Sequence, residues 1–413
     1  MNLAWLSAGA LLVAVALSCF TRLNVGLIAI AFAWIIGGLL GGMSPKQIAG
    51  GFPSELFLTL AGVTLLFSQA QTNGTLERLA RHAARLCKGN AGLLPLLFFL
   101  LASALASIGP GNIASAALLA PMAMAAALRS GISPFLMAIM VGNGASSGSL
   151  SPFAPTGIIV NGLMDRMGLG GFEFQNWSYN LAAHAAVAFA GYFLFGGLAL
   201  LRRRGAAGQR PSEPVPPFER PHWITLIVIA GLLASVLFAS APVGLAAFVA
   251  AAVVSLLRAA DESAAVKNIP WNTLLMVCGV TVLISILEKT QGMELFAGLI
   301  ASISTPASVT AVVAFVTGLV SVYSSTSGVV LPAFLPAIPS LIGKLGGGDA
   351  LAIASSMNIG GHLVDVSPLS TIGALCLASL VSYEDSRRLF YQLLAWGLSM
   401  SVVGAGVCFL LFR

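Results

Sequence analysis

Four short polar segments in an otherwise apolar chain carry residues that could bind a small anion and a small cation. They form two pairs, Ser107–Ser115 with Asn143–Gly157 and Ser321–Gly328 with Asn358–Gly373. Each segment combines hydroxyl or amide side chains with Gly or Pro, residues that interrupt a helix. Irregular backbone at membrane depth is tolerated only where it is buried in protein or lines a wet cavity. The segments therefore predict a transport site.

Broken helices suit an anion such as a carboxylate, because a helix N-terminus carries partial positive charge and free N–H groups. Such a site needs no Lys or Arg within the membrane, and the predicted midplane contains neither. We expect the substrate to contact Gly111, Asn112, Ser115, Thr156, Ser324, Ser325, Thr326, Ser327 and Thr371. The alternative is that these small polar residues only cap the helices of the hairpins.

The same breaks expose carbonyl and hydroxyl oxygens, which suit a small hard cation. Sodium is favoured over protons because both halves of the chain offer such oxygens. We expect sodium sites at Ser107, Asn112, Ser147, Gly148 and Ser149 in the first half, and at Ser321, Thr326, Gly361 and Asp365 in the second. Beyond sodium as a coupling ion, no cofactor is expected.

The two halves differ at one place. Where the first half has Ser146 and Ser149, the second has His362 and Asp365, the only ionisable pair predicted near the midplane. An ionisable residue inside a membrane is costly and is a functional candidate by default. Asp365 could bind a cation or, with His362, carry a proton; alternatively, it caps a helix. His184 is interpreted as a hydrogen-bonded packing residue.

The composition places the chain in a membrane. Its residues are 58% hydrophobic and 8% charged, whereas a soluble domain is about 25% charged. The net charge of +6 does not indicate a nucleic-acid partner, because most Lys and Arg fall in short loops and at helix ends. The five Cys are scattered without CxxC spacing, so neither a disulfide framework nor a zinc site is indicated.

The apolar runs predict an all-α polytopic membrane protein. Runs that can cross a bilayer, which takes about 20 residues, lie at 3–19, 24–42, 55–72, 178–201, 222–239, 241–258, 271–287 and 388–412. The first is interpreted as an uncleaved span, because no positive segment precedes it. Runs 133–168 and 349–383 are interrupted by Ser-Pro and predict broken helices. Runs 91–129 and 306–343 are too long for one helix and predict re-entrant hairpins.

Sequence landmarks recur along the chain at an offset of 214 to 218. Asn24-Val-Gly26 matches Pro242-Val-Gly244, Gly62-Val-Thr64 matches Gly279-Val-Thr281, and Ser151-Pro152 matches Ser367-Pro368. The series predicts an internal duplication, with repeats at 1–201 and 222–413 joined by a cytoplasmic linker at 202–221. Each repeat has five crossings, one of them broken, plus a hairpin. An odd number of crossings inverts the second repeat relative to the first.

Positive charge predicts the orientation of these spans. Loops on one side hold fifteen Lys and Arg, and those on the other hold five, namely Lys46, Arg166, Lys289, Lys344 and Arg413. Cytoplasmic loops carry the excess. The hairpin at 91–129 is therefore expected to enter from the cytoplasm and the hairpin at 306–343 from outside. Both termini are expected to be extracytoplasmic.

Four segments resemble the malonate (MatC-type) dicarboxylate carriers, namely Gly51–Phe67, Gln71–Thr75, Ile108–Asn112 and Ser151–Gly162. That family is part of the ion transporter superfamily, alongside the divalent anion/sodium symporters. The resemblance implies a homodimer in which a scaffold domain supports an elevator-type transport domain. In the symporters, Ser-Asn-Thr tips hold the substrate carboxylates and help bind sodium. Here only Asn112 and the Ser/Thr positions 324–327 carry over.

Together these features predict a secondary active transporter that imports a small dicarboxylate, malonate or a C4 acid, with a sodium gradient. The alternative is a proton-coupled carrier, or an exchange or efflux carrier for another oxyanion such as a sulfonate, citrate or arsenite. An enzyme is not expected, because the sequence has no HExxH motif, no intramembrane aspartate pair and no Cys/His cluster. The expected location is a bacterial inner membrane. The expected partners are the substrate, the bilayer and a second copy of the chain.

Overall fold

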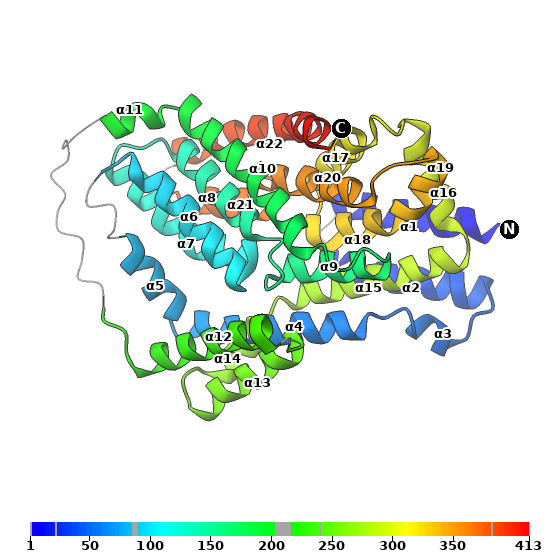
Figure 1. The fold of residues 1–413 in the computed structure, drawn as a ribbon, viewed down its shortest axis with the longest axis horizontal. Helices are drawn as coiled ribbons and strands as arrows, with labels where there is room; N and C mark the ends of the chain where they lie inside the picture. The colour runs from blue at the N-terminus through cyan, green and yellow to red at the C-terminus, as the bar shows by residue number, and fades with distance from the viewer. Residues whose placement is uncertain are drawn as a thin grey trace.

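The computed structural model describes residues 2–20, 23–84, 90–202, 216–239, 241–380 and 383–412. Within these ranges the backbone forms helices joined by turns and loops, with no strand. Most of the helices run along the long axis of the molecule (Figure 1). A bundle of this kind satisfies its backbone hydrogen bonds inside each helix, as a lipid environment requires.

Part of the predicted linker and several residues of the charge count lie outside the described residues. These are residues 203–215, which include Arg203, Arg204 and Arg210, together with Arg22, Arg85, Lys88 and Arg413. The described structure therefore bears on the helices and the site, and the sidedness of the loops stays a prediction.

The first half of the chain begins with helices that agree with the predicted runs 3–19, 24–42 and 55–72. They are α1 (Leu3–Phe20), α2 (Val25–Ala33) with its π-helical continuation η1 (Trp34–Leu40), α3 (Pro45–Ala49), α4 (Ser54–Thr72) and α5 (Thr75–Ala84). The run at 91–129 forms a helical hairpin and the run at 133–168 forms a helix in two parts. These elements are α6 (Leu93–Ile108), α7 (Gly111–Arg129), α8 (Pro134–Gly148) and α9 (Pro155–Arg166), followed by α10 (Glu173–Leu194) and α11 (Gly197–Arg202).

The second half repeats this order of elements. It comprises α12 (Arg220–Ala239), α13 (Val243–Leu256), α14 (Glu262–Lys267), α15 (Trp271–Lys289), α16 (Gly292–Ser302) and α17 (Val309–Ser321). The arm that returns from α17 is divided by its prolines into η3 (Thr326–Val330), α18 (Leu331–Phe334), η4 (Leu335–Ala337) and α19 (Ile338–Leu345). The second broken helix consists of α20 (Ala350–Leu363), η5 (Val364–Val366) and α21 (Thr371–Ala378), and α22 (Tyr383–Leu411) ends the described chain.

The landmark glycines make two close helix crossings. A Cβ atom on Gly279 of α15 would collide with the carbonyl of Gly26 on α2, and one on Gly62 of α4 would collide with the carbonyl of Gly244 on α13. Small residues allow two backbones to approach in this way. Each crossing joins one glycine of the first half to one of the second. Because Gly26 matches Gly244 and Gly62 matches Gly279 in the sequence, the two crossings are equivalent.

The breaks after α8 and α20 also share their local geometry. The Ser151 hydroxyl accepts a hydrogen bond from the Phe153 N–H, and the Ser367 hydroxyl accepts one from the Leu369 N–H. Gly157 and Gly373 lie against the carbonyls of Ser151 and Ser367 respectively, where a Cβ atom would not fit. Matched contacts of this kind show that corresponding segments of the two halves fold alike, and the inversion of one half relative to the other stays a prediction.

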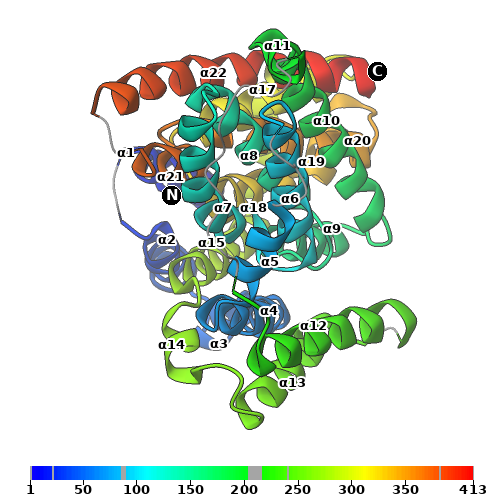
Figure 2. The ribbon, with the colours of Figure 1, turned by 90° about the vertical axis from the view of Figure 1, so that its left-hand side faces the viewer.

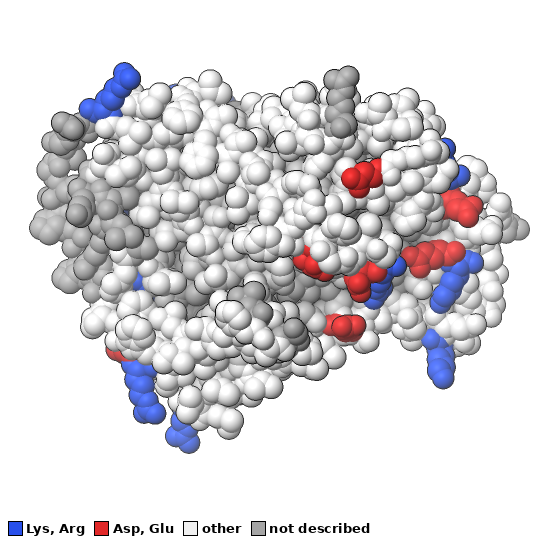
Figure 3. Space-filling view, in the orientation of Figure 1, with Lys and Arg blue, Asp and Glu red and all other residues white. Residues whose placement is uncertain are grey.

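The surface is suited to a bilayer. Five helical stretches are long and apolar enough to cross a membrane, namely Gly111–Arg129, Trp271–Lys289, Thr326–Leu345, Ala350–Ala378 and Ser386–Leu411, and several shorter apolar helices accompany them. On the face drawn in Figure 3 the Lys and Arg side chains lie toward the two ends of the long axis and most of the surface between them is uncharged. Large apolar side chains such as Phe238 and Leu256 are 88% and 81% exposed. An apolar belt between charged ends is what a polytopic membrane protein needs.

The helices divide into two groups when viewed along the long axis. Figure 2 shows α4, α12, α13 and α14 together on one side, with α10, α17 and α22 toward the other. The broken helices belong to the second group, since α8 packs on α6 and α10, and α20 packs on α17 and α22.

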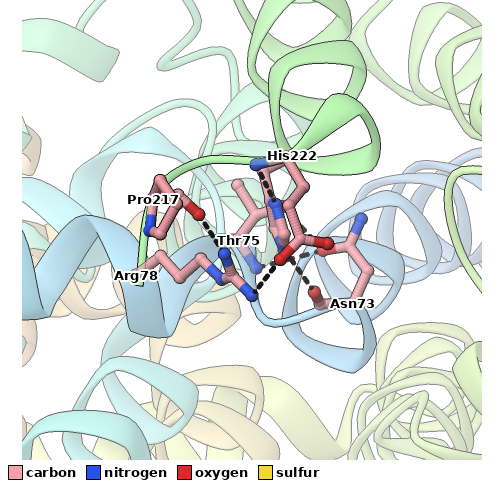
Figure 4. A network of polar contacts seen from close by, with 6 residues as sticks. Asn73, Thr75, Arg78, Pro217 and His222 are labelled. Carbon is pink, nitrogen blue, oxygen red and sulfur yellow. Dashed lines mark hydrogen bonds and ion pairs between the residues drawn. The ribbon is translucent and has the colours of Figure 1, made fainter. Parts of the chain in front are cut away.

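A polar network attaches the start of α12 to the turn between α4 and α5 (Figure 4). The Arg78 guanidinium donates to the Pro217 carbonyl and to Glu219 Oε1, the latter at 2.9 Å. His222 Nδ1 accepts from the Glu219 N–H at 2.9 Å, so its Nε2 donates to the Asn73 carbonyl at 3.1 Å. The network fixes the end of the predicted linker against the first half.

Candidate functional site

The two hairpin tips and the second broken helix line one cavity. Its volume is about 180 Å³, and its walls are formed by Asn112, Ile113, Tyr323, Ser324, Ser325, Thr326, Ser327, Asp365, Leu369, Ser370, Thr371 and Ile372. The segments come from positions more than 200 residues apart in the sequence. The structure thus brings together six of the nine residues expected to contact substrate: Asn112, Ser324, Ser325, Thr326, Ser327 and Thr371.

Two glycines shape the tip of the first hairpin. Gly109 and Gly111 have φ values of +144° and +77°, which L side chains rarely adopt. A Cβ atom on Gly109 would collide with the ring of Phe67, and one on Gly111 would meet the ring of Pro155. The tip therefore packs tightly between α4 and the start of α9, and Asn112 in the first turn of α7 faces the cavity.

Hydroxyl groups shape the tip of the second hairpin. The Ser325 side chain accepts a hydrogen bond of 3.1 Å from the Gly328 N–H, which caps the start of η3. Ser325 also accepts backbone hydrogen bonds from Val329 and Val330 at its carbonyl. These hydrogen bonds order the tip. Ser325 therefore caps η3, and as part of the cavity wall it can also contact substrate.

Asp365 is the carboxylate of the cavity. Its Oδ1 accepts hydrogen bonds from the Thr326 hydroxyl at 2.7 Å and from the Ser370 hydroxyl at 3.3 Å. The side chain is 6% exposed, and no Lys or Arg is among the residues that line the cavity. A buried carboxylate needs a compensating positive charge or a proton.

Helix N-termini supply positive potential to the same cavity. Asn112 and Ile113 belong to the first turn of α7, Thr371 and Ile372 begin α21, and Thr326 and Ser327 begin η3. Each N-terminus directs N–H groups and partial positive charge at the space in front of it. The cavity therefore favours an anion at the N-termini and a cation at Asp365.

The residues expected to bind sodium in the first half lie together beside the tip. Ser147 Oγ donates to Ser103 Oγ at 2.8 Å, and a Cβ atom on Gly148 would touch Ser107 Oγ. The Ser107 carbonyl accepts a 2.6 Å hydrogen bond from Ser151, and the Ser149 hydroxyl donates to the Ser146 carbonyl at 2.7 Å.

The corresponding residues of the second half lie together as well. A Cβ atom on Gly361 would meet Thr326 Cγ2 and lie 3.3 Å from Ser321 Oγ. Thr326 Oγ1 lies 3.3 Å from the Gly361 carbonyl and 2.7 Å from Asp365. No three His, Cys, Asp or Glu side chains gather at a metal-binding distance in the described residues, so sodium at either place would depend on hydroxyl and carbonyl oxygens and Asp365.

The structure places some predicted residues elsewhere. Gly111, Ser115 and Thr156 do not line the cavity, although Gly111 shapes its tip. His362 is fully buried away from the cavity walls, with Nδ1 2.8 Å from the Asn358 carbonyl, so it makes no hydrogen bond to Asp365. Ser370 and Tyr323 were not predicted and do line the cavity. The sequence feature that could have identified these two residues is their position directly before Thr371 and Ser324.

Comparison with known proteins agrees with the resemblance noted in the sequence. Residues 1–149 match the family model described as the dicarboxylate carrier protein MatC N-terminus. The fold is similar to the crystal structure of the YdaH transporter of Alcanivorax borkumensis, with a TM-score of 0.61 and 15% identity over 99% of this chain and 98% of that one. No curated protein sequence matches. Both matches are with transport proteins, which agrees with the expectation of a transporter rather than an enzyme.

Proposed function

We propose, from the match of residues 1–149 to dicarboxylate carriers, that this protein is a secondary active transporter that imports a small dicarboxylate with a cation gradient, sodium in the first place. The observation that supports this most is the cavity in which three helix N-termini and Asp365 meet. The substrates that fit the proposal are malonate and C4-dicarboxylates.

The cavity suits a small and doubly charged anion. A volume of about 180 Å³ is far above the roughly 10–15 Å³ that holds one water molecule, so the cavity has room for a small solute. A short dicarboxylate can direct one carboxylate to the N-terminus of α7 and the other to the tip that begins η3. Hydrogen bonds from backbone N–H groups and from Ser and Asn side chains to carboxylate oxygens are stronger than those between neutral groups.

The same cavity explains why the anion would need a cation. A dicarboxylate beside Asp365 would place like charges together in a partly dehydrated space, which is unfavourable unless a cation binds. Sodium held by Asp365, Thr326 and the Gly361 carbonyl would provide that charge. Binding of substrate and cation would then favour each other, as coupled transport requires.

The proposed mechanism is an elevator, in which a transport domain moves against a scaffold. Each of these two domains contains helices from both proposed inverted repeats. The proposed scaffold is α1, α2, α4, α12, α13 and α15, and the proposed transport domain contains both hairpins, both broken helices, α10 and α22. Ser151 and Ser367 make equivalent hydrogen bonds in the two halves, and Gly26 and Gly244 lie at equivalent helix crossings. These matches support the duplication. A homodimer in a bacterial inner membrane, with both termini outside, completes the proposal.

Uptake into proteoliposomes tests the proposal. Proteoliposomes that contain the purified protein should accumulate labelled malonate or succinate when an inward sodium gradient is imposed. They should accumulate far less when choline replaces sodium. Protein-free liposomes and an excess of unlabelled substrate serve as controls. Equal uptake with and without any imposed cation gradient would reject coupled import.

A proton-coupled or exchange carrier of another oxyanion is the second candidate. It is favoured by the burial of Asp365 in a cavity wall that contains no Lys or Arg, because a buried carboxylate without a positive partner is stabilised by binding a proton. A proton gradient in place of sodium, and preloading with citrate, a sulfonate or arsenite, would distinguish this candidate from sodium-driven import.

A further inference from the structure

A second cavity lies where α12 begins and α13 ends. Its volume is about 400 Å³, and its walls include Arg220, Ile224, Leu256, Leu257, Arg258 and Ala259. The two helices pack on each other, and Figure 2 shows them at the edge of the bundle. None of the residues that line this cavity lines the candidate functional site. The second cavity is therefore a separate feature of the molecule.

Two arginines give the second cavity its charge. Arg220 is the first residue of α12, and Arg258 lies two residues beyond the end of α13. Both are exposed, and neither has an ion-pair or side-chain hydrogen-bond partner in the part of the chain that the structure describes. Guanidinium groups bind phosphate and carboxylate oxygens with two parallel hydrogen bonds. The pair therefore favours an anion with several oxygens.

The acidic residues nearby do not neutralise this pair. Glu219 is bonded to Arg78, and Asp261 accepts from the Ala264 N–H at the start of α14. Glu262 is exposed in the first turn of α14, where a negative side chain is favourable. No Asp or Glu is among the residues that line the cavity.

The backbone at Arg258 is unusual for a residue with a side chain. Its φ is +52°, and the turn is closed by hydrogen bonds from the Arg258 N–H to the Ser255 carbonyl and from the Ala259 N–H to the Val254 carbonyl. After a helix end, Gly is the residue that usually adopts this left-handed conformation. Arg258 therefore keeps its guanidinium at a conformational cost that Gly would avoid.

A single side chain holds both walls of the cavity from behind. Asn73, which Figure 4 shows in the polar network, donates to Thr225 Oγ1 at 2.8 Å and to the Ala259 carbonyl at 2.9 Å. Thr225 follows Ile224 on α12, and Ala259 follows Arg258. The protein's own hydrogen bonds therefore position both helix ends, so a ligand does not have to order them.

An exposed apolar surface continues from the cavity along both helices. Ile227 lies one turn after Ile224 on α12 and is 68% exposed. On α13, Val253 and Val249 precede Leu256 by three and seven residues, so they share its face, and Val249 is 65% exposed. A charged cavity with an apolar surface leading away from it matches the two parts of a phospholipid.

Helix length places the cavity at a membrane boundary. α12 has 20 residues, which at a rise of about 1.5 Å each span about 30 Å, the thickness of the hydrocarbon core. Arg220 at its first residue therefore lies at the level of the lipid headgroups, and the exposed Trp223 fits the aromatic belt found there. The predicted orientation makes this the cytoplasmic boundary, whose leaflet carries anionic lipids.

We propose that the second cavity binds one anionic phospholipid. Arg220 and Arg258 donate hydrogen bonds to its phosphate oxygens, and its acyl chains lie along the exposed apolar faces of α12 and α13. A free phosphate ion would leave these faces unused, and a zwitterionic lipid would bring a positive group to the two arginines. The bound lipid joins the ends of two helices, and its binding does not depend on the proposed transport function.

Native mass spectrometry of the full chain in detergent tests the site, with phosphatidylglycerol and phosphatidylcholine as probes. We expect one phosphatidylglycerol to bind more tightly than phosphatidylcholine. Arg220→Gln and Arg258→Gln should each weaken the affinity for phosphatidylglycerol by about fivefold and leave that for phosphatidylcholine unchanged. Arg129→Gln is the matched control, because Arg129 is exposed at the end of α7, outside the cavity wall. Equal affinities for the two lipids would overturn the proposal.

Arg258→Gly separates loss of the lipid from loss of the fold. Gly adopts the φ of this position without strain, so the variant should be at least as stable as wild type in phosphatidylcholine nanodiscs. It should nevertheless bind phosphatidylglycerol as weakly as Arg258→Gln does. An Arg258→Gly variant with wild-type affinity for phosphatidylglycerol would contradict the proposal. Complete displacement of the lipid by inorganic phosphate would identify a site for a free anion and would overturn the assignment to a lipid.

Discussion

The Thr326 hydroxyl donates a 2.7 Å hydrogen bond to Oδ1 of Asp365 and so joins the tip of the second hairpin to the second broken helix. Both residues are nearly buried, with 5% and 6% exposure. The carboxylate of the cavity is therefore positioned by the same tip that is expected to contact substrate. A movement of the tip would change the environment of the only acidic residue in the cavity wall.

Asp365→Asn is expected to impair cation-driven uptake strongly. The amide oxygen can still accept from Thr326 and Ser370, so the fold is retained, but the negative charge that would balance a cation is lost. We expect uptake under a sodium gradient to fall by at least about tenfold, since hydrogen bonds and pairings of charged groups contribute about 1.5–3 kcal/mol. Asp261→Asn is the control, because Asp261 caps α14 through the Ala264 N–H at an exposed position.

Asn112→Asp is expected to weaken binding of an anion at the N-terminus of α7. The new carboxylate would keep the hydrogen bond from the Ile113 N–H but would repel a substrate carboxylate in the cavity. We expect the Kd for malonate to rise by about tenfold or more, measured by calorimetry. Asn90→Asp is the matched control, since Asn90 Oδ1 accepts from the Gly92 N–H outside the cavity wall. An unchanged Kd for Asn112→Asp would argue that substrate binds elsewhere.

Gly279→Ala is expected to destabilise the protein. The added methyl group would collide with the Gly26 carbonyl and force α2 and α15 apart, and overpacking of this kind costs about 1–3 kcal/mol. Gly62→Ala should have a similar effect at the equivalent crossing of α4 and α13. Gly231→Ala is the control, because a Cβ atom there meets nothing within 4 Å. Thermal unfolding in detergent measures all three, and a Gly279→Ala variant as stable as wild type would refute the close crossing.

Asn73→Ala is expected to detach the start of α12 from the first half. The side chain donates to Thr225 and to the Ala259 carbonyl, at 2.8 and 2.9 Å, and its oxygen accepts from Thr75. Loss of these partly buried hydrogen bonds should lower stability by about 1–3 kcal/mol. Glu219→Gln should lower it by less, because the ion pair of Glu219 with Arg78 is surface exposed. Protease sensitivity near residue 217 and thermal unfolding would rank the two variants.

The predicted orientation can be tested by labelling single cysteines with an impermeant maleimide. In a variant that lacks the five native Cys, Lys46→Cys and Lys344→Cys should react in intact cells. Arg129→Cys and Arg258→Cys should react only after the membrane is opened. Lys46 and Arg129 reacting from the same side would contradict the charge count.

The helical elements and their interruptions could be predicted from the sequence. The apolar runs became helices with nearly the predicted limits, and the breaks at Ser107–Ser115 and Ser321–Gly328 became the tips of hairpins. These features are local, because a run of apolar residues in lipid has to be helical and Gly or Pro ends it. The division into two repeats stays a prediction, and Gly26 and Gly244, which match in the sequence, both lie at close helix crossings.

Which polar residues share a space could not be predicted and depends on how the helices pack. Asn112 and Asp365 line one cavity, whereas Ser115 and Thr156 do not. His362, expected beside Asp365, is instead buried with Nδ1 2.8 Å from the Asn358 carbonyl, whereas His184 is buried and hydrogen-bonded to Asn143, as its interpretation as a packing residue requires. The physical reason is that a local pattern gives the spacing of residues on one helix, while the neighbour of each helical face is set by packing between segments distant in sequence.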